Sequence, residues 1–190
     1  MQKKTLHALL RPALVCCCLL FTLPVIQAIQ WHMTESITGI TGLHHDNAIL
    51  RLNIMKRDLG PSPNAKQLTA FYHQGPQGIA SALKPYGYFE PIITKRLYQN
   101  RSHVLAKYHV TPGPRIFVKL ANFSIQGEGA SMPYFQSIQT NFPIKADDPL
   151  NTSLYDQTKE NLMTTAINRG YLNAHFKNTT LEINTKAHTA

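Results

Sequence analysis

The chain is 190 residues long and carries 19 Lys+Arg against 10 Asp+Glu, which gives a formal net charge of +9. That length allows one domain or two domains of about 75 to 80 residues each. All three cysteines, Cys16, Cys17 and Cys18, lie inside one apolar run near the start of the chain. A chain from which that run is removed has no thiol for a disulfide, a nucleophile or a cysteine metal site.

The beginning of the chain has the layout of a secretory signal peptide. Basic residues precede or interrupt an apolar run from Ala13 to Ile26 that holds no acidic residue. This run is shorter than the roughly 18 to 20 apolar residues that a membrane-spanning helix needs. Ala28 is a small residue suited to the position before a cleavage site. We therefore expect residues 1–28 to be removed on export, with an uncleaved membrane anchor as the alternative.

The exported part of the chain stays basic. It keeps 16 Lys+Arg (19 minus Lys3, Lys4 and Arg11) against 10 Asp+Glu, a net charge of +6. Its basic residues are scattered and form no run of four. This distribution is typical of a solvated surface, with weak contact to acidic phospholipid headgroups as a second role. An exported chain has little access to nucleic acid, so we expect no nucleic-acid partner.

A short strand and a helix are expected at the start of the exported chain. Residues 35–43 alternate weakly and run into a glycine turn, which indicates a strand. Residues 46–57 place apolar side chains near one face of a helix, and Asp46 is a plausible N-cap. Lys56 and Arg57 suit the C-terminal end of that helix, where cations interact favourably with the helix dipole.

A second helix is expected from about residue 65 to residue 86. The Gly-Pro-Ser-Pro stretch at 60–63 must separate it from the helix before. Gly75-Pro76 lies in its middle, and proline removes a backbone donor and clashes with the preceding turn. We therefore expect this helix to be kinked or split in two at that point.

Two strands should follow, over residues 88–98 and 103–111, joined by a turn at 99–102. Pro91 cannot donate a hydrogen bond to a neighbouring strand, so the first of these strands belongs at a sheet edge. The Thr-Pro-Gly-Pro stretch at 111–114 is the strongest break in the exported chain. We place a domain junction there.

The same order of elements is then predicted a second time. A strand is expected over 115–126, helices over 132–140 and 154–169, and strands over 171–177 and 179–184. Asn151 or Ser153 should cap the second of these helices. Gly87-Tyr88 aligns with Gly170-Tyr171, and in each copy glycine can end the helix in the left-handed conformation before an aromatic residue starts a strand. The predicted fold is thus α+β, with two tandem β-α-α-β-β domains.

No motif for catalysis or metal binding stands out. His44 and His45 are adjacent, and neighbouring side chains diverge on a helix or strand, so they seldom share an ion. Asp147 and Asp148 lack further acids at the spacing of a calcium loop. The sequence also has no nucleophile elbow, phosphate loop or dinucleotide fingerprint. We expect neither enzymatic activity nor a cofactor.

The strands that follow the two glycines are the candidate binding sites. An edge strand offers unpaired backbone groups to an incoming peptide, which can add to the sheet as a further strand. The side chains of one alternating set on each strand are the candidate contacts: Tyr88, Glu90, Ile92 and Thr94 in the first half, and Tyr171, Asn173 and His175 in the second.

Residues 36–185 resemble the N-terminal POTRA domains of the TamA family of outer-membrane assembly factors. The resemblance is carried by Leu-Lys-Pro-Tyr-Gly-Tyr-Phe-Glu-Pro at 83–91, followed by Val-Thr-Pro-Gly-Pro at 110–114. Asn-Arg-Gly-Tyr-Leu at 168–172 corresponds to the joint of a second such domain. The resemblance implies POTRA-like domains at 36–112 and 113–186, each with a three-stranded sheet on two helices.

The resemblance also implies where the chain works and with what. It points to the periplasm of a Gram-negative bacterium, to a role in outer-membrane protein and autotransporter assembly, and to a TamB-like inner-membrane-anchored partner. Unfolded outer-membrane protein chains are possible clients. Members of the family continue with a third POTRA domain and a membrane barrel, whereas this chain ends at Ala190. We therefore expect a binding module without its own barrel, the alternative being a truncated or decayed gene product with only a structural role.

Overall fold

The computed structural model describes residues 31–100 and 102–190. The predicted signal peptide, residues 1–28, and the three cysteines lie outside these described residues. Within the described ranges, none of the helices combines the length and the apolar content needed to cross a membrane.

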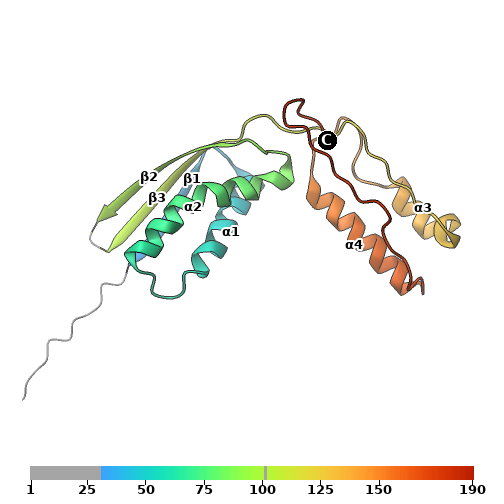
Figure 1. Cartoon of the computed structure of the whole chain (residues 1–190), viewed down its shortest axis with the longest axis horizontal. Coiled ribbons are helices and arrows are strands. Elements are labelled where there is room, and N and C mark those ends of the chain that lie inside the picture. Colours follow the sequence, from blue (N-terminus) through green and yellow to red (C-terminus); the bar gives the residue numbers. More distant parts are fainter. Residues whose placement is uncertain (1–30, 101) are drawn as a thin grey trace, which may run out of the picture.

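The first half of the chain is a three-stranded sheet with two helices on one of its faces (Figure 1). The strands lie in the order β1-β3-β2, so that the last strand is central; β1 runs parallel to β3 and β2 runs antiparallel to it. The predicted α+β class and the β-α-α-β-β order of this half are confirmed. Its elements are β1 (His32–Thr38), α1 (Gly42–Arg57), α2 (Ala65–Leu83), the 3-10 turn η1 (Lys84–Tyr86), β2 (Ile92–Asn100) and β3 (His103–Thr111).

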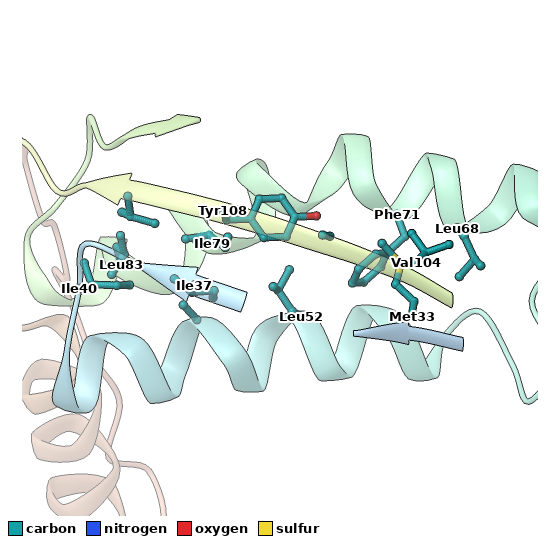
Figure 2. Close-up of a cluster of buried hydrophobic side chains, with 13 residues drawn as sticks. Met33, Ile37, Ile40, Leu52, Leu68, Phe71, Ile79, Leu83, Val104 and Tyr108 are labelled. Carbon is teal, nitrogen blue, oxygen red and sulfur yellow. The ribbon is translucent and has the colours of Figure 1, made fainter. Parts of the chain in front are cut away.

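The apolar core lies between this sheet and the two helices (Figure 2). Alternate side chains of a strand point to opposite faces of its sheet, and β3 follows this rule along its whole length. Four of its residues are buried against the helices: Val104, Ala106, Tyr108 and Val110. The helices contribute the fully buried Leu52, Ile79 and Leu83 to the same cluster. None of the helices in residues 31–100 and 102–190 covers the opposite face of the sheet (Figure 1).

Helix α2 runs through Gly75-Pro76 as one helix, so the predicted split does not occur. Pro76 has no N–H group for the carbonyl of Tyr72, four residues earlier in the helix. The hydroxyl of Tyr108 donates to that carbonyl at 3.3 Å. Gly75 has no side chain, and a Cβ atom there would overlap the ring of Tyr108. The Gly-Pro pair therefore makes a notch in α2 that receives a tyrosine from the central strand.

The helix starts are set by the turns before them. The prediction that Asp46 caps the first helix is wrong, because α1 begins at Gly42 with Thr41 at the N-cap position. The chain leaves β1 through Gly39, whose positive φ of 90° and close approach to the carbonyl of Val110 exclude a side chain there. Helix α2 starts at Ala65, as predicted, behind a capping box in which Asn64 and Gln67 satisfy each other's backbone N–H groups.

Strand β3 has the predicted bounds, but β2 begins at Ile92 and not at residue 88. The chain first forms η1, which Gly87 ends in the left-handed conformation at φ 86°. Tyr88 then makes only an isolated bridge to Arg115. Pro91 cannot join a strand ladder as a donor, so regular pairing starts after it.

The predicted helices of the second half are confirmed. They are α3 (Pro133–Thr140) and α4 (Thr152–Asn168), preceded by the 3-10 turn η2 (Glu128–Ser131). Asn151 is the N-cap of α4, since its side chain accepts a hydrogen bond from the N–H of Ser153 at 3.1 Å.

The second three-stranded sheet is not formed in the described residues. The strands predicted over 115–126, 171–177 and 179–184 are replaced by irregular chain with isolated bridges. The reason is a small apolar core, which consists of Ile116, Val118 and Leu150 with a few partly buried neighbours. A sheet of this size needs a helix layer to cover one face, and α4 buries only Ala166.

A short three-segment pairing takes the place of that sheet. Residues 116–118 exchange backbone hydrogen bonds with 147–150 on one side, and 117–119 do so with 188–190 on the other. The bridge between Phe117 and Thr189 is parallel, as is the pairing of β1 with β3 in the first half. The two halves meet where Gly87 accepts a hydrogen bond from Ile116 at 2.8 Å.

Candidate interaction edge

Strand β2 forms one free edge of the sheet in the first half. Within the described residues it pairs with β3 alone, over nine residues from Ile92 to Asn100. In an antiparallel pair the backbone groups of alternate residues point toward the partner strand, and those between them point away. The outer side of β2 therefore offers a row of N–H and C=O groups that another chain can use.

The side chains of β2 divide between the two faces of the sheet. Ile93, Lys95 and Leu97 pair with buried residues of β3 and so lie on the face covered by the helices. Gln99 pairs with the buried Val104 and lies on the same face. The remaining residues lie on the open face, where Ile92 is 67% exposed and Tyr98 is 48% exposed. An edge strand that combines free backbone groups with exposed apolar side chains has the features of a peptide-binding edge.

Two cationic side chains occupy the middle of β2. The ammonium group of Lys95 lies 3.0 Å from Nδ1 of His73 and 4.6 Å from the ring centroid of Tyr72, both on α2. Arg96 lies on the open face, in register with Lys107 of β3. The ammonium group of Lys107 in turn lies 5.0 Å from the ring centroid of Tyr98.

Of the first set of predicted site residues, two lie on β2 and two do not. Ile92 and Thr94 are on its open face. Tyr88 belongs to the joint between the halves, where the guanidinium of Arg115 lies 5.6 Å from its ring centroid. Glu90 lies in the same connection, and its carbonyl leaves no room for a side chain on Gly113. The assignment of Tyr88 and Glu90 to an edge strand is therefore wrong.

The second set of predicted site residues lies on no strand. Tyr171 follows the end of α4, and its N–H donates to the carbonyl of Ala166 at 3.0 Å. The hydroxyls of Tyr134 and Tyr171 lie 3.5 Å apart, and the hydrogen bond between them raises the pKa of Tyr171. Asn173 and His175 are exposed and are joined by a contact of 3.0 Å between the Asn173 carbonyl and Nδ1 of His175. This segment stays without a sheet because of the small core described above.

Lys95, Arg96 and Tyr98 are not among the predicted site residues. The predicted residues form one alternating set and end at Thr94, before the end of β2 at Asn100. The consecutive Lys-Arg pair inside a predicted edge strand was the signal that could have found them. The predicted absence of a metal site remains a prediction, although no cluster of three potential ligands occurs in residues 31–100 and 102–190.

The order β1-β3-β2 with two helices on one face defines the class of the first half as a POTRA-type domain. A family model described as the first POTRA domain of TamA matches residues 35–112. Residues 35–112 are therefore similar to that domain, as the sequence resemblance implied. POTRA domains are protein-interaction modules of outer-membrane assembly, and they are not enzymes.

Two solved structures of BamA are among those to which the chain is similar. One, containing POTRA domains 3–5 of the Haemophilus influenzae protein, is 14% identical and covers 71% of this chain and 50% of its own, with a TM-score of 0.32. Another, from Haemophilus ducreyi and lacking POTRA domains 1–3, is 17% identical and covers 72% of this chain and 24% of its own, also with a TM-score of 0.32. The chain thus spans half of the first structure and about a quarter of the second. No curated protein matches the sequence.

Proposed function

We propose that this chain is a periplasmic protein-binding module that takes up extended segments of other proteins as an additional strand along β2. The observation that carries the proposal is the free edge of β2, nine residues long, with Ile92, Leu97 and Tyr98 exposed along it. Backbone hydrogen bonds would supply affinity in such a complex, and alternate side chains would supply specificity.

The similarity of residues 35–112 to the first POTRA domain of TamA supports the choice of a partner class. The partner class is a TamB-like protein anchored in the inner membrane, or an unfolded outer-membrane protein or autotransporter on its way to assembly. The signal peptide predicted at 1–28 is the route by which the chain reaches that compartment.

The sheet has a second outer strand, β1, whose edge is less suited to binding a partner strand than the edge of β2. Strand β1 has seven residues, and its side chains include the buried Met33 and Ile37 and a largely buried Glu35. On β2, by contrast, every residue from Arg96 to Asn100 is exposed. A partner strand therefore meets more accessible surface on β2.

A pair of proline substitutions on β2 tests the proposal. Thr94→Pro and Lys95→Pro affect adjacent residues. Because the backbone groups of neighbouring residues point in opposite directions, one of these two residues directs its N–H toward β3 and the other directs its N–H away from the sheet. The outward substitution keeps the sheet intact but removes a donor from the edge. We expect that variant to keep the wild-type melting temperature and to lose the envelope proteins that the wild type captures. Equal capture by a folded edge variant and the wild type would overturn the proposal.

A second candidate is a chain with a structural role alone. It is favoured by the lack of a sheet among the described residues after Thr111 and by the exposure of Leu120 and Leu172 at 70% and 76%. This candidate predicts that neither the wild type nor the edge variants bind envelope proteins.

A further inference from the structure

The middle of β2 carries positive charge on both faces of the sheet. Lys95 lies on the helix-covered face, and Arg96 lies on the open face beside Lys107. Among the described residues, ion pairs link only Lys56 to Glu35 and His45 to Asp46. The three cations at the centre of the edge are thus left without a carboxylate partner within the described chain.

The pair of Arg96 and Lys107 is unfavourable for the fold itself. The two residues face each other across antiparallel strands, and like charges in such positions destabilise a sheet. The described strand residues on the open face include no acidic side chain that could offset the repulsion between Arg96 and Lys107. By register this face consists of His32, Thr34, Ser36 and Thr38 of β1, His103, Leu105, Lys107, His109 and Thr111 of β3, and Ile92, Thr94, Arg96, Tyr98 and Asn100 of β2. An anionic group bound beside Arg96 would remove this repulsion.

We propose that the segment received by β2 is an acidic strand with carboxylates at two consecutive positions, one beside Lys95 and one beside Arg96. This inference rests on the proposed function. Consecutive residues of an added strand point to opposite faces of the sheet, so two neighbouring carboxylates reach the two cations separately. Apolar residues on either side of the acidic pair lie beside Ile92 and Tyr98, which are exposed at the two ends of β2.

The position of Lys95 favours a strand over a membrane as the anionic partner. A bilayer lying on the open face contacts Arg96 and Lys107 together. It does not contact Lys95, whose ammonium group lies on the helix side near His73 and Tyr72. Only a partner that lies along the edge reaches both faces at once.

The same charges also keep two copies of this chain from pairing through their β2 edges, since cationic side chains are a common protection of exposed strands. If protection were their only role, β2 would accept no peptide at all. If they also select a partner, β2 accepts an acidic strand and rejects a basic one. Peptide binding separates these two roles.

The test uses the full chain and three peptides that are as long as β2 and share one alternating apolar and threonine sequence. They differ only at two central positions, which are Glu-Glu, Gln-Gln or Lys-Lys. Two cross-strand charge pairs contribute a factor of about 2 to 30 in affinity, so the Glu-Glu peptide should bind tighter than the Gln-Gln peptide by that factor. The advantage should shrink with added salt, which screens exposed charges.

Variants of the chain test whether the preference for the Glu-Glu peptide comes from the cations of β2. Lys95→Gln combined with Arg96→Gln should abolish the preference for Glu-Glu and leave Gln-Gln binding unchanged. The control combines Lys66→Gln with Lys177→Gln, which removes the same charge from exposed positions away from β2 and should preserve the preference. Lys95→Glu combined with Arg96→Glu should reverse it and select the Lys-Lys peptide.

The outcomes separate this inference from the proposed function. Equal binding of the Glu-Glu and Gln-Gln peptides, lost when alternate peptide nitrogens are methylated, would overturn the acidic-strand inference and support strand addition. Binding of anionic vesicles that needs Arg96 and Lys107 but not Lys95, without peptide binding, would overturn both and indicate a lipid partner. Failure of all three peptides and of vesicles to bind would also overturn both.

Discussion

The hydroxyl of Tyr108 donates to the carbonyl of Tyr72, the group that Pro76 leaves without its usual helical donor. This contact explains how α2 stays continuous through a proline while packing on the central strand. Gly75 completes the arrangement, because a side chain there would occupy the space of the tyrosine ring.

The first prediction concerns the two glycines of α2 that face other elements. Gly75→Ala places a methyl group against the rigid ring of Tyr108, whereas Gly78→Ala meets the sulfur of Met55, at the flexible end of its side chain. Overpacking against a rigid group costs about 1 to 3 kcal/mol, and alanine regains up to about 1 kcal/mol of helix propensity at both positions. Urea unfolding should therefore show Gly75→Ala destabilised and Gly78→Ala near the wild type. Equal losses of unfolding free energy in the two variants would show that the ring of Tyr108 does not exclude a side chain at Gly75.

The second prediction is a loss of stability at alkaline pH that depends on Tyr108. Burial, and secondarily the charge of Glu35, raises the pKa of Tyr108 above its ordinary value of 10.0. The folded chain thus keeps a proton that the unfolded chain releases. The resulting stabilisation is complete below pH 10 and is lost as the pH rises through the folded pKa, at up to about 1.4 kcal/mol per pH unit.

Tyr108→Phe removes this titration and one hydrogen bond. It should cost about 0.5 to 1.5 kcal/mol at pH 7 and flatten the fall in unfolding free energy above pH 10. Tyr98→Phe is the control, because Tyr98 is 48% exposed. An identical alkaline profile for the wild type and Tyr108→Phe would show that Tyr108 does not carry the effect.

The third prediction concerns the ion pair between β1 and α1. Nζ of Lys56 lies 2.7 Å from Oε2 of Glu35, whose side chain is 7% exposed, while that of Lys56 is 34% exposed. Oε1 of Glu35 has no hydrogen-bond partner among the described residues. Lys56→Met leaves a buried carboxylate uncompensated, whereas Glu35→Gln leaves a lysine that can turn toward water.

We therefore expect Lys56→Met to cost about 1 to 3 kcal/mol of unfolding free energy and Glu35→Gln to cost less. The double variant should recover part of the loss, because it contains neither charge. Chemical unfolding of all four chains forms a double-mutant cycle. Strictly additive losses would mean that the pair does not interact.

The sequence was informative wherever a local rule acted alone. Asn151 and Gly87 set their helix ends through residues only a few positions away, and β3 follows its alternating pattern. The notch at Gly75-Pro76 could not be predicted, because its hydrogen bond joins residues 36 positions apart. Pro91 correctly predicted that the strand after it lies at the edge of the sheet. The bounds of β2 and the cations at its centre follow from the extent of its pairing with β3, which involves residues of another strand.

The predicted duplication of the domain is likewise correct for the features that local sequence determines and wrong for the sheet. The helices and the glycine stop of the second half need only local sequence, and they are present. A sheet needs enough apolar surface from distant segments to bury one face, and here only Ile116, Val118 and Leu150 form the buried cluster. The same helix and glycine motif is therefore followed by a sheet in the first half and by irregular chain in the second half.

The last prediction compares the two equivalent glycines, since both have a φ of 86°. A Cβ atom on Gly87 would lie 3.1 Å from the carbonyl oxygen of Ile116 and 3.2 Å from that of Leu150, whereas one on Gly170 would have nothing within 4 Å. Both alanine variants incur about 1 to 2 kcal/mol for the left-handed conformation. Gly87→Ala should lose about 1 kcal/mol more than Gly170→Ala through crowding.

Hydrogen exchange locates that additional loss. The N–H of Ile116 donates to Gly87 across the joint between the halves, so Gly87→Ala should speed the exchange of this amide, and Gly170→Ala should not. Gly170→Asn should be nearly neutral, because asparagine tolerates the left-handed region. Equal destabilisation by the two alanine variants, with no change at Ile116, would show that the contacts around Gly87 do not hold the halves together.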